Sequence, residues 1–173
     1  MTPDRATTAC RIRPYEQRDW EAIERIHDAA RLDELRESVG TEAFLSLADT
    51  YQGEGLFDGR VWVAEDPAVA GFVALDEDEV TWLYVDPARY GRGIGTALLR
   101  HALAHGGPRV ETTVLAGNQR ALDLYLREGF TLVETKTGRL AGNEKFAATG
   151  HILEHRKAPR QDGRADGPHG PAR

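Results

Sequence analysis

The hydrophobic residues of this chain form short continuous runs in its middle and recur at helical spacing on either side, and this pattern predicts a mixed α/β domain. Three runs rich in β-branched and aromatic residues span positions 60–64, 69–75 and 79–85. Turn-forming residues separate them, Asp66-Pro67 in one case and Asp76-Glu77-Asp78 in the other. Because connections this short usually join neighbouring antiparallel strands, the three runs are predicted to form a meander.

Helical spacing and further strands flank this meander. Residues 11–15 are predicted to form a first strand, and Asp19 is the candidate N-cap of a helix that repeats Trp20, Ile23, His27 and Ala30. A second short helix is predicted at 41–48. Beyond residue 85 the pattern becomes helix, strand, helix, strand, with one strand at 110–114 and a final strand at 145–154, preceded by a loop at 138–144.

A glycine-rich turn follows the third run. Residues 80–99 read VTWLYVDPARYGRGIGTALL, in which the strand ends at Asp86-Pro87 and a helix begins near Ile94. Glycine lets main-chain amides approach a ligand, and the first amides of a helix lack internal partners and lie at the positive end of its dipole. The turn is therefore predicted to bind an anion, most simply a phosphate.

The spacing of the glycines narrows the class of phosphate site. A Walker loop ends in Gly-Lys-Ser or Gly-Lys-Thr, which does not follow these glycines. A dinucleotide fingerprint would have glycine at position 96, where this chain has Thr96, and its glycines would follow the strand at once, whereas residues 86–90 intervene. Glu111 does lie at about the distance expected of a ribose-binding acid. A Rossmann-type oxidoreductase is thus a remote alternative.

A second motif follows the strand at 110–114. Residues 118–130 read NQRALDLYLREGF, in which Asn118 is a favourable N-cap and Gly129 can take the left-handed conformation that ends a helix. Together with Gly93-Ile94-Gly95, this motif resembles the GNAT superfamily of N-acyltransferases. The family patterns are (Gln or Arg)-x-x-Gly-x-(Gly or Ala) and Asn-x-x-Ala-x-x-x-Tyr-x-x-x-Gly-Phe. Tyr90 departs from them, since it stands at the Gln or Arg position.

The resemblance implies a fold, a co-substrate and a set of contacts. The fold is the GNAT-like acyl-CoA N-acyltransferase α/β fold, a mixed central sheet of about seven strands that is splayed between its fourth and fifth strands and flanked by helices. The co-substrate is acetyl-CoA, with no metal. The residues implied to contact acetyl-CoA are Leu83, Tyr84, Val85, Gly91, Arg92, Gly93, Ile94, Gly95, Thr96, Asn118 and Tyr125.

Acyl transfer to an amine also needs an acid and a base. The resemblance places Tyr125 where a phenol protonates the departing CoA sulfur, and a phenol with a pKa of about 10 is protonated at neutral pH. Its alternative role is packing on an amphipathic helix. Glu79 is the candidate base, acting directly or through a water, although a solvated hairpin turn explains it equally well. His27 fits a packing role better than a substrate contact.

Composition fits one domain and excludes several classes. The chain has 173 residues, of which 40% are hydrophobic and 29% charged, enough for one domain with a core at residues 11–154. Residues 1–10 are predicted to be a flexible leader and 155–173 a disordered tail. Neither a signal peptide nor a membrane span is evident, so a cytoplasmic location is expected. Cys10 is the single cysteine and excludes an intramolecular disulfide.

The resemblance to the GNAT family, together with the charge of the chain, implies the function. A formal net charge of −6 argues against nucleic acid as a partner and suits a cationic amine. We therefore predict an N-acetyltransferase in which a primary amine, of a small molecule or a peptide, attacks acetyl-CoA directly in a ternary complex. A non-catalytic acyl-CoA-binding or regulatory module is the alternative. The sequence does not identify the amine, and a homodimer is possible.

Overall fold

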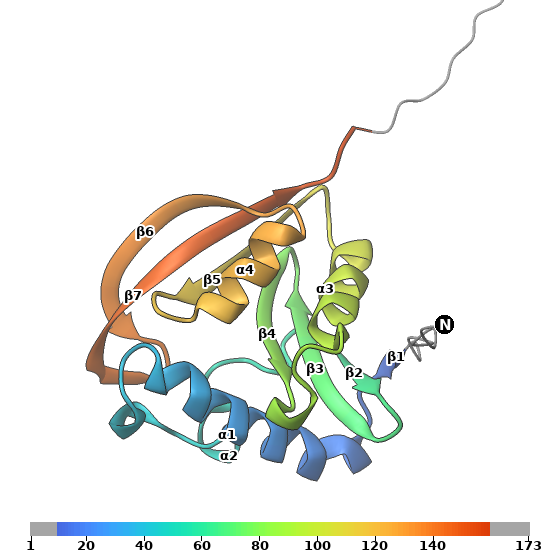
Figure 1. Cartoon of the computed structure of the whole chain (residues 1–173), viewed down its shortest axis with the longest axis horizontal. Coiled ribbons are helices and arrows are strands. Elements are labelled where there is room, and N and C mark those ends of the chain that lie inside the picture. Colours follow the sequence, from blue (N-terminus) through green and yellow to red (C-terminus); the bar gives the residue numbers. More distant parts are fainter. Residues whose placement is uncertain (1–9, 160–173) are drawn as a thin grey trace, which may run out of the picture.

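The computed structural model describes residues 10–159, whose strands form one seven-stranded sheet in the order β1-β2-β3-β4-β5-β7-β6 (Figure 1). The strands are β1 (Arg11–Pro14), β2 (Arg60–Glu65), β3 (Val69–Asp76), β4 (Glu79–Val85), β5 (Arg109–Leu115), β6 (Thr131–Leu140) and β7 (Asn143–Arg156). β4 and β5 pair in parallel, and the other neighbouring pairs are antiparallel. The predicted mixed sheet and its central meander are confirmed.

Helices connect the strands and cover the sheet. The described part of the chain contains the α-helices α1 (Trp20–Arg36), α2 (Leu47–Thr50), α3 (Ile94–His105) and α4 (Gln119–Arg127), and the 3₁₀ turns η1 (Gln17–Asp19), η2 (Thr41–Ala43) and η3 (Pro87–Arg89). None of the helices within residues 10–159 has the length and apolar character needed to cross a membrane.

Alternation along β2 and β3 divides the core between the two faces of the sheet. Trp62 and Val73 pack in one cluster with Leu98 of α3, whereas Val63 and Phe72 pack in a second cluster with residues of α1. Because successive strand residues point to opposite faces, a strand covered on both faces is apolar throughout. This explains the nearly continuous apolar run of β3, whose six central residues are all buried.

The sheet is almost interrupted between β4 and β5. Their parallel pairing is limited to Glu79 opposite Glu111, next to which the amide of Glu111 donates to the Asp78 carbonyl at 2.8 Å. The Thr112 hydroxyl adds a side-chain hydrogen bond of 2.9 Å to the Val80 carbonyl. Beyond this point the two strands diverge, with α3 and α4 on the two sides of the opening (Figure 1). The splay that the family resemblance implies is therefore present.

Two local predictions in the N-terminal half differ from the structure, one of them only in part. The helix predicted at 41–48 is divided into η2 and α2, because Phe44 is extended and Ser46 starts a new helix by accepting a 3.2 Å hydrogen bond from the Asp49 amide. Asp19 occupies the N-cap position of α1, as predicted, but its side chain makes no cap hydrogen bond. Its carboxylate instead accepts two hydrogen bonds from Arg13 of β1, at 2.7 and 2.8 Å, which a helix pattern does not reveal.

The C-terminal hairpin is longer than the sequence predicted. Residues 138–140 belong to β6, and Gly138 pairs with Ala148, so the predicted loop at 138–144 shrinks to a tight turn around Gly142, which has a φ of +78°. β7 continues to Arg156, two residues beyond the predicted end of the domain at position 154. The predicted leader, apart from Cys10, and positions 160–173 of the predicted tail lie outside the described residues.

Candidate active site

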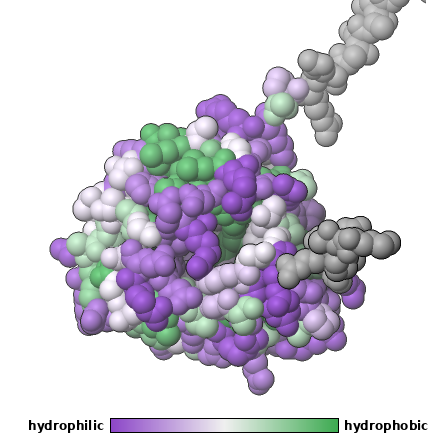
Figure 2. Space-filling model, viewed as in Figure 1, coloured by the Kyte–Doolittle hydropathy of each residue, from purple (hydrophilic) through white to green (hydrophobic). Residues whose placement is uncertain are grey.

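A cleft of about 510 Å³ opens where β4 and β5 diverge. Its walls come from these strands, from the turn before α3 and the first turn of α3, and from the facing sides of α1 and α4. Figure 2 shows this face of the molecule hollowed near its centre, with hydrophobic residues inside and hydrophilic residues around the rim. The predicted acetyl-CoA contacts that line the cleft are Leu83, Tyr84, Val85, Gly91, Gly93, Ile94, Gly95, Thr96, Asn118 and Tyr125.

The glycine turn leaves the start of α3 open to the cleft. Gly91 and Gly93 have φ values of +75° and +80°, which glycine adopts without steric cost. A Cβ placed on either residue would meet no atom within 4 Å. Gly93 is the N-cap of α3 and provides no side-chain cap, so the first amides of the helix lack intrahelical partners. This open, electropositive turn can hold a diphosphate, as the sequence predicts.

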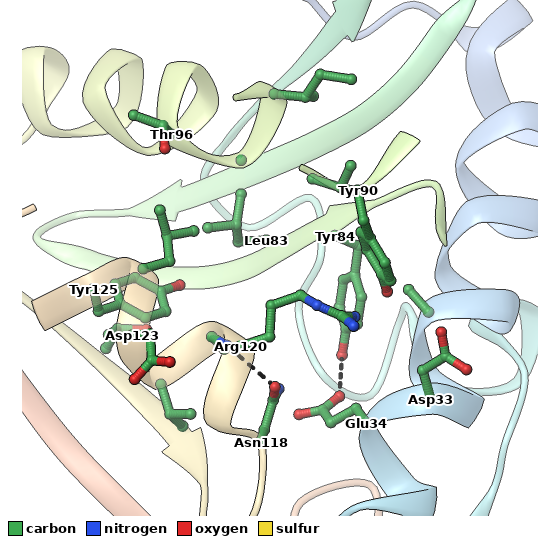
Figure 3. A pocket seen from close by; sticks show the side chains of 18 of the residues that line it. Asp33, Glu34, Leu83, Tyr84, Tyr90, Thr96, Asn118, Arg120, Asp123 and Tyr125 are labelled. Atoms are coloured by element: carbon green, nitrogen blue, oxygen red, sulfur yellow. Dashed lines mark hydrogen bonds between the residues drawn. The ribbon is translucent and has the colours of Figure 1, made fainter. Parts of the chain in front are cut away.

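The second motif places a phenol in the opposite wall. Asn118 caps the start of α4 by accepting a 3.2 Å hydrogen bond from the Ala121 amide. Gly129, just beyond the end of the helix, has a φ of +92° and so takes the left-handed conformation that terminates it. The Tyr125 side chain is buried and packs edge-on against Phe130, with ring centroids 5.1 Å apart. The cap role of Asn118 is therefore observed, and both residues also line the cleft (Figure 3).

Burial raises the pKa of Tyr125 to about 12. The negative charge of Glu34 raises it further, whereas interaction with the Thr112 hydroxyl lowers it. Because the pKa lies far above 7, the phenol is protonated at neutral pH and can donate a proton or a hydrogen bond.

An acidic wall on α1 was missed from the sequence. Asp33, Glu34 and Glu37 line the cleft from the side facing α4. The Glu34 carboxylate accepts a hydrogen bond from the Tyr84 hydroxyl at 3.2 Å (Figure 3). It accepts another from Arg31 at 2.7 Å. Burial, together with Glu34, strongly raises the pKa of Tyr84. The helical periodicity of α1 indicates its buried stripe, but it does not tell which acidic residues face a cleft that a distant strand completes.

Two predicted site residues lie outside the cleft lining. The Arg92 side chain is 56% exposed, and its guanidinium lies 4.0 Å from the Asp66 carboxylate in the β2–β3 turn. Glu79 stands at the closed end of the splay, opposite Glu111. Partial burial raises the pKa of Glu79, and the charges of Glu111 and Asp76 raise it further.

His27 lies on the far side of Tyr84, in a small cavity of about 40 Å³. Its ring is buried against Trp82 and Tyr84, with centroid distances of 5.6 and 4.9 Å, and its Nδ1 lies 2.9 Å from the Asp28 carboxylate. Burial lowers the pKa of His27, so its imidazole is neutral at pH 7. These contacts agree with the packing role predicted for it.

Sequence comparisons agree with the motifs. Residues 57–132 match the family model described as an acetyltransferase (GNAT) domain. The peptidyl-lysine N-acetyltransferase YjaB of Salmonella typhimurium is 34% identical over 112 residues, which cover 60% of this chain and 74% of YjaB. The mycothiol acetyltransferase of Beutenbergia cavernae is 39% identical over 85 residues, 47% of this chain and 26% of that protein. The chain belongs to the GNAT acetyltransferase family.

Solved structures show the same fold. YncA of Salmonella typhimurium, solved with its cofactor acetyl-CoA, matches 89% of this chain and 99% of its own with a TM-score of 0.62 at 20% identity. The chain spans only 26% of the mycothiol acetyltransferase and 54% of Escherichia coli YjaB. These matches establish the family and the fold, and the reaction and its substrates are inferred from the site.

Replacing Gly93 with Asp should weaken the binding of CoA by about ten-fold or more, because the new side chain fills the space over the first amides of α3 and its carboxylate repels phosphate. Calorimetric titration with CoA measures the loss. The positive φ adds a folding cost of about 1–2 kcal/mol, so thermal unfolding is recorded for the same protein.

Gly138→Ala is the matched control, because position 138 lies on β6 and a Cβ there contacts no atom within 4 Å. Wild-type affinity for CoA in the folded Gly93→Asp protein would contradict an anion site at this turn.

Proposed function

We propose that this chain is an acetyl-CoA-dependent N-acetyltransferase that acetylates a primary amine. One observation carries the proposal: the cleft between β4 and β5 combines an open anion-binding turn with a buried, protonated phenol, Tyr125. The relationship to YjaB, which is named a peptidyl-lysine N-acetyltransferase, supports the type of reaction. The acetyl-CoA bound in YncA supports the co-substrate.

The chain offers matching groups to each part of acetyl-CoA, which supplies an activated thioester. The amides at the start of α3, from Gly93 to Thr96, would donate to the diphosphate. Residues 83–85 of β4 have no partner on β5, since the pairing ends near Glu79. Their free main-chain groups would hydrogen-bond to the pantetheine arm and the acetyl carbonyl. The co-substrate would thus take the place of the missing neighbouring strand.

Proton transfer is assigned to two side chains of the cleft. An amine with a pKa of about 10.4 arrives mostly protonated and must lose a proton before it attacks. Glu34 lines the cleft from α1, on the side facing α4, which carries Tyr125, so we place the base there. The nitrogen then bonds to the acetyl carbon as the carbon–sulfur bond breaks, and Tyr125 donates its proton to the departing sulfur. The excess proton on the amide nitrogen then passes to the Tyr125 phenolate, and Glu34 releases its proton to solvent. Glu79 stays a prediction, since it lies outside the cleft lining.

The charge of the cleft wall favours a cationic acceptor. The cleft lining includes the carboxylates of Asp33 and Glu34 of α1 and of Glu37, which is the C-cap of that helix. Asp33 pairs with Arg36 and Glu34 with Arg31, and the whole chain carries a formal net charge of −6. Opposite charges attract over a distance of several ångströms, so this wall would concentrate a protonated amine, on a small molecule or a peptide, beside the base.

Release of the CoA thiol from acetyl-CoA, followed with a panel of amines, tests the function. We expect release that depends on an amine, together with an acetylated product identified by mass spectrometry. The position of Glu79 outside the cleft leaves a second candidate, a non-catalytic acyl-CoA-binding module. Binding of acetyl-CoA without thiol release for any amine in the panel would favour that module.

The variant Tyr125→Phe should lower kcat by about 100-fold or more, because the phenylalanine ring keeps the packing but cannot protonate the sulfur. Its affinity for acetyl-CoA should change little. Because the pKa of Tyr125 is about 12, the phenol stays protonated and the wild-type rate should show no loss from this group below pH 10. A kcat and a pH–rate profile equal to those of the wild type would rule out the acid role.

The two candidate bases are separated by comparing Glu34→Gln with Glu79→Gln. Loss of a general base should lower kcat at neutral pH by about 100-fold, and we expect this loss for Glu34→Gln. Glu34 also makes hydrogen bonds with Arg31 and Tyr84, so their loss could destabilise the fold. The thermal unfolding temperature of Glu34→Gln is therefore measured as a control. If Glu79→Gln instead loses the rate and Glu34→Gln keeps it, the base is Glu79.

A further inference from the structure

We propose that Arg120 binds a phosphate group of the acyl-CoA and that Tyr90 is the positioning residue that holds its guanidinium at the cleft. The inference rests on the proposed function, because it assigns a residue of this chain to the same co-substrate. Arg120 is the second residue of α4, and Tyr90 directly precedes the glycine turn. Both residues line the cleft.

A cation–π contact joins these two residues across the cleft. The Cζ atom of Arg120 lies 3.8 Å from the centroid of the Tyr90 ring. Figure 3 shows the Arg120 side chain extending from α4 toward Tyr84 and Tyr90. The contact therefore joins α4 to the segment that leads into the anion-binding turn.

The cation–π contact leaves the guanidinium able to bind an anion. The contact engages the face of the tyrosine ring, whereas a guanidinium carries five N–H donors in a fork that matches the geometry of phosphate oxygens. Within residues 10–159 no carboxylate forms an ion pair with Arg120. The tyrosine ring thus fixes the position of the charge without neutralising it.

The arginines nearest the glycine turn are engaged by Asp66. Arg89 lines the cleft, but it donates to the Asp66 carbonyl and has its Nη1 3.5 Å from the Asp66 carboxylate. Arg92 approaches the same carboxylate. The turn itself then offers amide dipoles but no free full charge. Arg120 supplies that charge from a different element.

Carboxylates of the cleft also favour a cation at the phosphate site. Asp33 and Glu34 of α1 line the same cleft, where each pairs with an arginine of its own helix. Burial raises the pKa of Tyr90, the charge of Arg120 lowers it, and the charges of Asp33 and Glu34 raise it. A phosphate that enters the cleft would be repelled by these carboxylates. The guanidinium of Arg120 offsets the repulsion at the end of the cleft where the glycine turn lies.

Calorimetric binding to the full chain tests the assignment with three probes: CoA, 3′-dephospho-CoA and pantetheine. Arg120→Gln should lose about ten-fold or more in affinity for CoA, the size expected for a hydrogen bond between charged groups. It should keep wild-type affinity for pantetheine, which has no phosphate. Equal losses for CoA and 3′-dephospho-CoA would assign Arg120 to the diphosphate, and a loss confined to CoA would assign it to the 3′-phosphate.

Variants at position 90 test the positioning role. Tyr90→Phe keeps the ring face and should retain the affinity for CoA, whereas Tyr90→Leu should lose several-fold of it. Because Tyr90 acts through Arg120, adding Tyr90→Leu to Arg120→Gln should cause little further loss. Arg139→Gln, on the exposed strand β6, is the control for removing one positive charge.

The outcomes separate this inference from the proposed function. If the wild-type protein binds CoA and Arg120→Gln binds it equally well, only the inference is wrong. If Arg120→Gln loses affinity for pantetheine as much as for CoA, the residue acts on the shape of the cleft and the inference is again wrong. A wild-type protein that binds no CoA would overturn both the inference and the proposed function.

Discussion

The contact at which β4 and β5 still pair controls the rest of the site. Glu79 lies opposite Glu111 there, and the Thr112 hydroxyl reaches the Val80 carbonyl. This contact joins strands β1 to β4 and strands β5 to β7 into one continuous sheet. Beyond it, β4 and β5 diverge. Main-chain groups next to the divergence have lost their strand partner, and such groups need another one. The same feature therefore creates the space of the cleft and leaves hydrogen-bonding groups in its wall.

Charge divides the cleft into regions that suit different parts of a reaction. Open amides at the start of α3 and the guanidinium of Arg120 favour an anion. The carboxylates of Asp33 and Glu34 favour a cation. Tyr125 is buried in the same cleft and stays neutral, because burial penalises its phenolate. An anionic co-substrate and a cationic acceptor would thus be drawn to different walls of one cleft, in which Tyr125 can act as a proton donor.

Predictions based on local patterns agree well with the structure. β4 has the predicted bounds, α3 begins at Ile94 as the glycine turn indicates, and Asn118 caps α4. The errors occur where distant residues decide the local conformation. Gly138 looks like a loop residue but is held in β6 by pairing with Ala148 of β7. Asp19 occupies the N-cap position of α1, but its carboxylate binds Arg13 of β1 in place of the helix amides.

The sequence alone determined the order of the elements, the family and the two motifs, because apolar periodicity, glycines and caps act over a few neighbouring residues. Only the tertiary structure decided which side chains meet in the cleft. Glu34 faces Tyr84, Arg120 covers Tyr90, and Arg92 is directed toward Asp66. Such meetings depend on how α1, α4 and the splayed strands pack against one another, and the spacing of residues along a chain carries no information about those packing angles.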